Sequence, residues 1–265
     1  MMSHPFLRFP AVLAMAIALA GCGRSESYRY KLTLAVDTPT GVKRASSVAQ
    51  VLFWDVSIPA RGTMHKLRGQ ALYLDLGPGA RPLIALLTSH RPSPCVTCPG
   101  NIWTLDGGPS LRLISRVYGI AQSTDYRDDI PRIARLRGPH RITPNDLPDL
   151  VTFEDINNPS TVIEVDPNNL QATLGPDVSW NELTLESTDE PITKGIELKL
   201  PWIPAYWCGM LDGRRYHDKA TLANTLSTAD FDWSDEARER INQKLRGNIE
   251  LECWKGRTAW AQRHQ

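Results

Sequence analysis

Alternation of apolar and polar residues is clearest over residues 28–36, near the start of the chain. Five apolar side chains fall on one side of an extended backbone there, namely Tyr28, Tyr30, Leu32, Leu34 and Val36. A period of two residues is typical of a β-strand with one buried face. Turn-forming residues follow at 37–41. We therefore predict a strand over 28–36 and a returning strand over 48–56.

Shorter apolar runs follow, separated by clusters of glycine, proline and asparagine. The chain has 20 prolines and 18 glycines, which fits many short elements joined by turns. We predict further strands at residues 71–76, 83–87, 162–165, 182–186 and 196–200.

Helical patterns are fewer than strand patterns. Two helices are predicted at residues 109–118 and 130–136. A third, near the C-terminus, has Ser234 as N-cap, Asp235 at the positive end of the helix dipole and Gly247 as its stop. The sequence therefore predicts an α+β fold: a strand-dominated mixed domain with antiparallel sheets and a few short helices.

The N-terminal residues have the features of an export signal. Arg8 is the single fixed charge among the first 21 residues, and the apolar run at 9–20 follows it. That run is too short to span a bilayer, because a spanning helix needs about 20 apolar residues. A basic head, a short apolar middle and small residues at its end are typical of a secretory signal.

The apolar run ends in Leu19-Ala20-Gly21-Cys22, which resembles the lipobox of bacterial lipoproteins. The resemblance implies cleavage before Cys22 and attachment of a diacylglyceryl group to its thiol. In this class Gly23, where a retention-type Asp would otherwise stand, implies sorting to the outer membrane. The alternatives are an ordinary thiol after an ordinary signal, or an uncleaved membrane anchor.

These features predict three parts of the chain. They are a cleaved signal peptide at 1–21, a short tether with lipidated Cys22 at 22–27, and a single globular domain at 28–265. Two or more acyl chains give stable anchoring, whereas one chain binds only marginally. We therefore expect the membrane as a partner through the lipid anchor, with the domain in the periplasm and close to the outer membrane.

Charge argues against nucleic acid as a partner. Removal of residues 1–21 takes away one of the 30 basic residues and none of the 29 acidic ones, which leaves 29 of each. A chain without net charge has no global field that would attract polyanions. Another envelope protein is the remaining macromolecular partner that we expect.

Four cysteines remain besides Cys22, namely Cys95, Cys98, Cys208 and Cys253. An even number in an oxidising compartment indicates disulfides, and three pairings are possible. We favour a Cys95–Cys98 bridge and a Cys208–Cys253 bridge. The spacing of Cys95 and Cys98 also occurs in redox and zinc motifs. However, Pro99 would stop the helix that a redox motif needs, and the other two cysteines lack zinc-ligand spacing.

Other candidate chemistry is weak, and we predict no catalytic residue, no metal and no cofactor. His217 and Asp218 are adjacent, as in some metal phosphohydrolases, but a surface loop explains them more simply. Residues 155–158 and 166–169 offer oxygen ligands for calcium, yet they lack the glycine and glutamate of a twelve-residue calcium loop. Turn-forming Asp and Asn residues account for both segments.

Residues 127–141 are rich in arginine. They hold Arg127, Arg132, Arg135, Arg137 and Arg141, together with His140, Asp128 and Asp129, and several acids follow at 146–155. With a short tether, this segment could contact anionic headgroups or lipopolysaccharide phosphates. We favour mutual neutralisation with the adjacent acids, since the mature chain has no net charge.

Aromatic residues are concentrated in the second half of the chain. Six of the eight tryptophans lie there, at Trp180, Trp202, Trp207, Trp233, Trp254 and Trp260. They could line a binding groove, but large aromatic side chains more often fill a core, and we favour the core.

Residues 151–176, with 190–195 and 200–202, resemble segments of bacterial envelope proteins of unknown function. The resemblance implies no activity and no catalytic residue. We therefore predict a membrane-anchored, non-enzymatic binding or assembly module that uses a sheet edge, the aromatic region, or both. The alternative is a periplasmic hydrolase whose Asp and His residues converge only in the fold.

Overall fold

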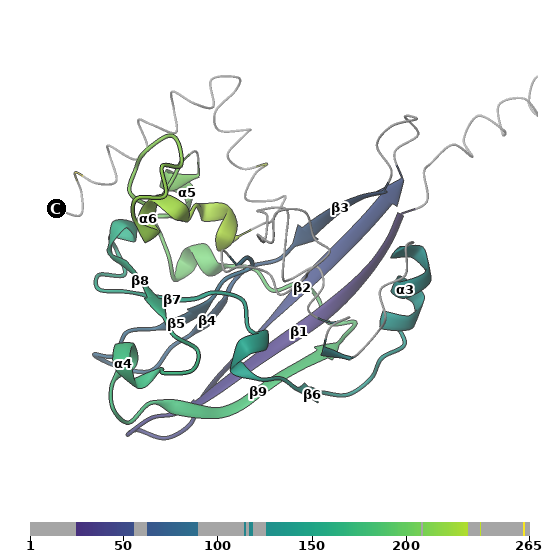
Figure 1. The fold of residues 1–265 in the computed structure, drawn as a ribbon, viewed down its shortest axis with the longest axis horizontal. Coiled ribbons are helices and arrows are strands. Elements are labelled where there is room, and N and C mark those ends of the chain that lie inside the picture. Colours follow the sequence, from purple (N-terminus) through teal and green to yellow (C-terminus); the bar gives the residue numbers. More distant parts are fainter. Residues whose placement is uncertain are drawn as a thin grey trace, which may run out of the picture.

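The computed structural model describes residues 25–55, 63–89, 114, 117–118, 126–207, 209–232, 239 and 262. Within these ranges the chain forms two antiparallel sheets, a few short helices and connecting turns (Figure 1). The strand-dominated α+β class predicted from the sequence is confirmed.

The larger sheet is built around the first strand. It has the order β3-β2-β1-β9-β6, and every neighbouring pair is antiparallel. Its strands are β1 (Ser25–Asp37), β2 (Lys43–Asp55), β3 (Thr63–Arg68), β9 (Ser179–Ser187) and β6 (His140–Arg141). The predicted strand at 28–36 is confirmed and begins three residues earlier, while β2 begins five residues before the predicted strand at 48–56.

The two faces of β1 follow the alternation in its sequence. Its apolar side chains from Tyr28 to Val36 are buried on the inner face. On the outer face, Lys31 forms ion pairs with Glu186 and Glu190, and the hydrogen bond to Glu190 raises the pKa of Lys31. The pattern of buried and paired side chains therefore fixes the register of this strand.

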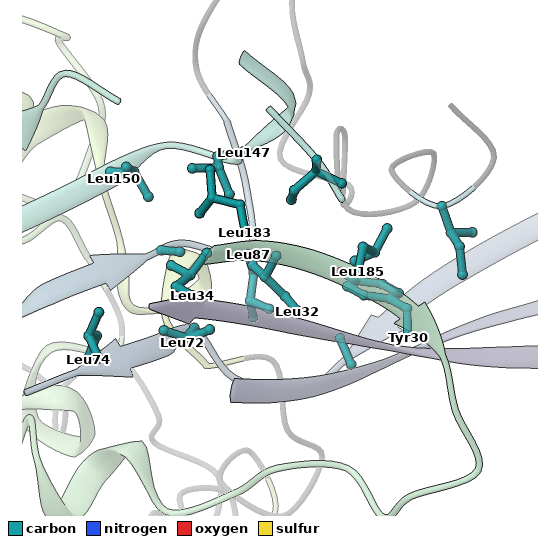
Figure 2. Close-up of a cluster of buried hydrophobic side chains, with 14 of the residues drawn as sticks. Tyr30, Leu32, Leu34, Leu72, Leu74, Leu87, Leu147, Leu150, Leu183 and Leu185 are labelled. Carbon is teal, nitrogen blue, oxygen red and sulfur yellow. The ribbon is translucent and has the colours of Figure 1, made fainter. Parts of the chain in front are cut away.

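The smaller sheet packs over the inner face of the larger one. It has the order β4-β5-β7-β8, formed by β4 (Leu72–Leu74), β5 (Leu83–Ala85), β7 (Leu150–Phe153) and β8 (Val162–Val165). Side chains from both sheets meet in one core, where Leu34, Leu72, Leu150 and Leu185 point into the space between them (Figure 2).

The other face of the smaller sheet is buried as well. Ile84, Val151 and Phe153 face a layer of short helices and turns from the second half of the chain. That layer contains η3 (Ile196–Leu198), α5 (Ile203–Tyr206), α6 (Leu222–Thr225) and η4 (Thr228–Asp230). Because both faces are covered, β7 has no polar alternation, and the sequence analysis did not identify it as a strand.

Trp202 is the largest fully buried side chain of this layer. Its ring centroid lies 5.7 Å from that of Phe153 and 5.4 Å from that of Phe231. Its indole N–H donates a 3.0 Å hydrogen bond to the Ile156 carbonyl, so the polar atom is satisfied. The interpretation of Trp202 as a core residue rather than a groove residue is confirmed.

The predicted strand at 196–200 is wrong, because this segment begins with a 3-10 helix. Gly195 precedes the helix with φ 97°, and the Leu200 amide donates to the Ile196 carbonyl at 2.8 Å. A strand would bury every second residue, but Leu198 is 83% exposed whereas Ile196 and Leu200 are buried. Their spacing of four residues is the helical period.

Helices cover the part of the core that the smaller sheet leaves open. α3 (Tyr126–Ile133) overlaps the helix predicted at 130–136 but begins and ends earlier, and it buries Ile130 and Ile133. Ile114 and Val117 are the described helical residues of the predicted helix at 109–118. The remaining helix is α4 (Gln171–Leu174), with short 3-10 turns at η1 (Pro144–Asp146) and η2 (Pro159–Thr161).

The predicted C-terminal helix lies outside the described residues except for Glu239, which is helical.

A glycine makes the close approach between β3 and β2 possible. Gly69 has φ +138°, and a Cβ added there would lie 3.1 Å from Ala49 Cα. We expect Gly69→Ala to lower the free energy of unfolding by about 2–3 kcal/mol, from backbone strain and the clash together.

Gly79→Ala provides the matched control. Gly79 also has a positive φ, +77°, but nothing lies within 4 Å of its added Cβ. It should cost only about 1 kcal/mol, from the left-handed backbone alone. Urea unfolding of both variants measures the difference, and equal losses would contradict the close approach at Gly69.

Candidate functional site

The start of β1 limits where the predicted lipid anchor can lie. Cys22 is outside the described residues, but β1 begins at Ser25, which pairs with Trp54 of β2. Residues 25–27, which we predicted to belong to the tether, are therefore part of the sheet. Three Cα–Cα steps separate Cys22 from Ser25, so Cys22 Cα lies within about 11 Å of the end of the strand.

The arginine-rich segment forms an exposed surface that reaches the middle of β1, because β6 pairs with β9 level with Leu32 and Thr33. α3 packs against β1, and Figure 1 shows it next to the half of the strand that starts at Ser25. We define the basic face as five exposed residues on α3, β6 and the turn between them, namely Arg132, Arg135, Arg137, His140 and Arg141. The side chain of Arg127 is outside the described part of the chain.

The arginines of the basic face differ in their partners. Arg137 Nη1 donates to the carbonyl oxygens of Ala134 and Leu136, both at 2.7 Å, near the C-terminal end of α3. Arg132 Nη1 lies 3.8 Å from Asp129 Oδ1 on the same helix. No ion pair within the described ranges involves Arg135 or Arg141.

The acids that follow the basic face have partners of other kinds. Asp146 accepts hydrogen bonds from the Thr143 amide at 2.9 Å and from its hydroxyl at 2.7 Å. The buried carboxylate of Asp149 accepts a hydrogen bond from the Ser89 hydroxyl at 2.6 Å. Neutralisation within the described residues is therefore seen for Arg132, inside its own helix, and not for Arg135 or Arg141.

Tyr118 holds the basic face against the edge of the sheet. Its hydroxyl donates a hydrogen bond to the Gly138 carbonyl at 2.8 Å, with the Leu185 carbonyl at 3.2 Å. Its ring centroid lies 4.8 Å from that of His140. Burial raises the pKa of the Tyr118 hydroxyl, so it stays protonated and able to donate at neutral pH.

His217 and Asp218 lie in an exposed loop, as predicted. The loop is organised by Asn224, which is fully buried. The Asn224 side chain donates to Asp212 Oδ2 at 2.8 Å and accepts hydrogen bonds from the amides of Asp218 and Lys219. His217 Nδ1 contacts the Asn224 carbonyl at 3.2 Å, and Asp218 pairs with Arg214.

The two candidate calcium segments are turns, as predicted. Asp155 accepts a hydrogen bond from the Asn157 amide at 2.9 Å, and Asp166 accepts one from the Asn168 amide at 2.8 Å. In the described part of the chain, no three His, Cys, Asp or Glu side chains are placed together as metal ligands.

Sequence analysis missed a set of buried polar residues between the smaller sheet and the helical layer. Asp230 is fully buried and accepts hydrogen bonds from the Ser227 amide at 2.7 Å and from the Thr88 hydroxyl. Backbone contacts run alongside, since the Leu87 amide donates to the Asp230 carbonyl at 2.9 Å. The sequence did not indicate these contacts, because the partners lie far apart along the chain. The Thr88 hydroxyl and the Asp230 carboxylate join two distant segments of the fold.

The remaining candidates are placed only in part. All five cysteines, Cys22, Cys95, Cys98, Cys208 and Cys253, lie outside the described residues, so both disulfides stay predictions. Trp180 is half-buried and donates to the Pro167 carbonyl at 2.8 Å, and Trp207 is also half-buried. Trp233, Trp254 and Trp260 lie outside the described ranges.

Three turns form a groove at the opposite end of β1. The groove has a volume of about 340 Å³ and is lined by residues 38–40, 76–80 and 174–178. Its lining includes Pro39, Gly77, Pro78 and Pro176, so both backbone and apolar rings face the solvent. At about 3.3 Å per residue, the 13 residues of β1 place this distal groove about 40 Å from Ser25.

Comparison with known proteins adds no relative. No protein-family model matches the chain, and no curated protein or solved structure is significantly similar to it. Among the described residues, no helix is long and apolar enough to cross a bilayer.

The role of Asn224 can be tested by unfolding. We expect Asn224→Ala to lower the free energy of unfolding by about 2–4 kcal/mol, because several buried or partly buried polar groups lose their partner. Thr225→Ala removes one hydrogen bond, from Thr225 Oγ1 to the Thr221 carbonyl at 3.0 Å, and should cost less than about 1 kcal/mol. Equal effects in thermal or urea unfolding would contradict the organising role of Asn224.

Proposed function

We propose that the chain is a lipid-anchored envelope protein whose globular domain is a non-enzymatic binding or assembly module held close to the outer membrane. The observation that carries the proposal is the start of β1 at Ser25. With Cys22 as the lipidated residue, no flexible leash would separate the acyl chains from the central strand. The domain would stay within about 11 Å of its anchor.

This arrangement gives the domain two functionally different ends. The end at Ser25 would face the bilayer, and the distal groove would point away from it, since β1 runs from one end to the other. Turns lie at the surface and expose backbone donors and acceptors, and binding residues often lie on them, which suits contact with another protein. We propose the distal groove as the surface that meets another envelope protein.

The contacts of the candidate acid and base residues favour binding over hydrolysis. A hydrolase would need His217 and Asp218 to share a pocket with carboxylates from residues 146–155. Instead, His217 contacts a backbone carbonyl, Asp218 pairs with Arg214, and Asp155 closes a turn. Each of these groups thus has a local structural use.

The anchor is tested by removing its thiol. We expect Cys22→Ala to lose the N-terminal acyl mass and to move from the membrane fraction to the soluble fraction, because one sulfur atom carries the attachment. Cys98→Ala is the matched control and should remain acylated and membrane-bound. Mass spectrometry and fractionation of both variants decide the point, and a membrane-bound Cys22→Ala protein would refute the anchor.

The partner surface is tested by photo-crosslinking in intact envelopes. A photoreactive residue at Ala80, which is exposed and lines the distal groove, should give a discrete protein adduct. The same residue at Ala134, which is exposed in the turn after α3 and does not line the groove, should give none. Adducts at both positions, or at neither, would contradict a protein partner at the groove.

A further inference from the structure

A second hollow lies on the connection that runs from the end of β8 through α4 to the start of β9. This pocket has a volume of about 230 Å³ and is lined by residues 167–171 and 178–180. Trp180 pairs with Val36, so the pocket lies near the same end of β1 as the distal groove, where Figure 1 shows α4. We name it the amide pocket, after the side chains at its rim.

The floor of the amide pocket belongs to the core between the two sheets. Leu170 and Val178 are buried in that core, and Trp180 is half-buried and packs against it. The indole N–H of Trp180 donates to the Pro167 carbonyl at 2.8 Å, which fixes the edge of the ring. A floor and an aromatic wall that are already ordered lower the entropy cost of binding.

The rim of the amide pocket consists of exposed polar side chains, those of Asn168, Asn169, Gln171 and Ser179. Asn168 donates to Asn145 Oδ1 at 3.1 Å. Within the described part of the chain, the side chains of Asn169, Gln171 and Ser179 form no hydrogen bond. Each of the two amides therefore offers a donor and an acceptor to a ligand.

The lining selects the charge of a ligand. None of the described residues that line the amide pocket is charged, so an ionic ligand would lose hydration without gaining a counter-charge. The exposed acids Asp166 and Asp177, which adjoin lining residues in the sequence, would repel an anion. The pocket therefore favours a neutral ligand.

The combination of an aromatic ring with amides selects the shape of the ligand. Small-molecule sites join an apolar or aromatic wall to a few placed polar groups. A pyranose ring matches this pattern, because its C–H face can pack on an indole while hydroxyl groups around its edge exchange hydrogen bonds with amides. The pocket is smaller than the ~300–1,000 Å³ of a drug-sized site, which suits one such ring.

We infer that the amide pocket binds one neutral pyranose unit of a glycan. The Trp180 ring packs on a C–H face of the sugar, and Asn169 and Gln171 bind its hydroxyl or acetamido groups. The inference uses neither the lipid anchor nor a partner at the distal groove. Its failure would therefore leave the proposed function untouched.

The experiment measures sugar binding by the full chain, purified in a detergent without sugar groups. Saturation-transfer NMR is recorded with two neutral trimers, triacetylchitotriose and cellotriose. We expect transfer to the ring C–H protons of one or both, with a Kd on the order of 1 mM. Binding should not change with salt, and trigalacturonate, with a carboxylate on each ring, should bind at least about fivefold more weakly.

Exposed amides provide variants that leave the fold intact. Asn169→Ala and Gln171→Ala should each weaken binding about fivefold, the effect of one neutral hydrogen bond. Asn181→Ala is the matched control, since this exposed asparagine on β9 donates to Asp37 Oδ1 at 3.0 Å and does not line the pocket. It should bind as the unchanged chain does.

The tryptophan is tested with two substitutions. Trp180→Ala should abolish saturation transfer, whereas Trp180→Phe keeps an aromatic ring and should retain part of it. Thermal unfolding of both variants shows whether the fold is kept, and the amide variants decide the point if it is not.

The outcomes separate the possible ligands. Stronger binding of triacetylchitotriose would support recognition of an acetamido group, and equal binding of both trimers would support recognition of ring hydroxyls. Saturation transfer to neither trimer would overturn the inference. So would equal binding of trigalacturonate, or a loss in Asn181→Ala as large as that in Asn169→Ala.

Discussion

The pairing of β1 on both sides is the constraint on which the rest of the structure depends. Its register with β2 is continuous from Ser25 opposite Trp54 to Val36 opposite Lys43, and β9 pairs along its other edge. A shift by one residue would turn its buried apolar side chains to the outer face and Lys31 into the core. Every other element is therefore positioned relative to a strand that cannot slide.

The smaller sheet connects the β1 core to the second half of the chain. One of its faces completes the core on β1, and the other needs a cover for Phe153, Ile84 and Val151. Trp202 and Phe231 provide that cover, and the buried Asp230 joins it to Thr88 through a hydrogen bond. The helical layer has little regular secondary structure of its own, so its stability depends on burial against this sheet.

The sequence predicted strands that alternation or flanking turn residues mark locally, and it missed β7. β1 was predicted from the alternation of its residues, and β8 from the turn residues at its ends. β7 is buried on both faces, so its sequence shows no alternation of apolar and polar residues. Residues 196–200 were misassigned because an apolar residue at every second position also fits a helix that leaves Leu198 in solvent. The local turns at Asp155 and Asp166 were predictable, since donor and acceptor are two residues apart. The Thr88–Asp230 contact was not, because 142 residues separate its partners.

The basic face shows how tertiary structure changes the meaning of a charge pattern. In the sequence, the acids at 146–155 follow the arginines closely enough to neutralise them. In the fold, Asp146 closes a 3-10 turn, Asp149 is buried against Ser89, and Asp155 forms a turn, so each carboxylate is oriented by a local hydrogen bond. Within the described ranges none of these acids forms an ion pair with Arg135 or Arg141, so the two exposed guanidinium groups are not neutralised there. The domain thus carries a cationic surface on α3 and β6 beside the sheet and a groove of turns after the end of β1, and an uneven distribution of charge gives a molecule a preferred orientation at a charged boundary.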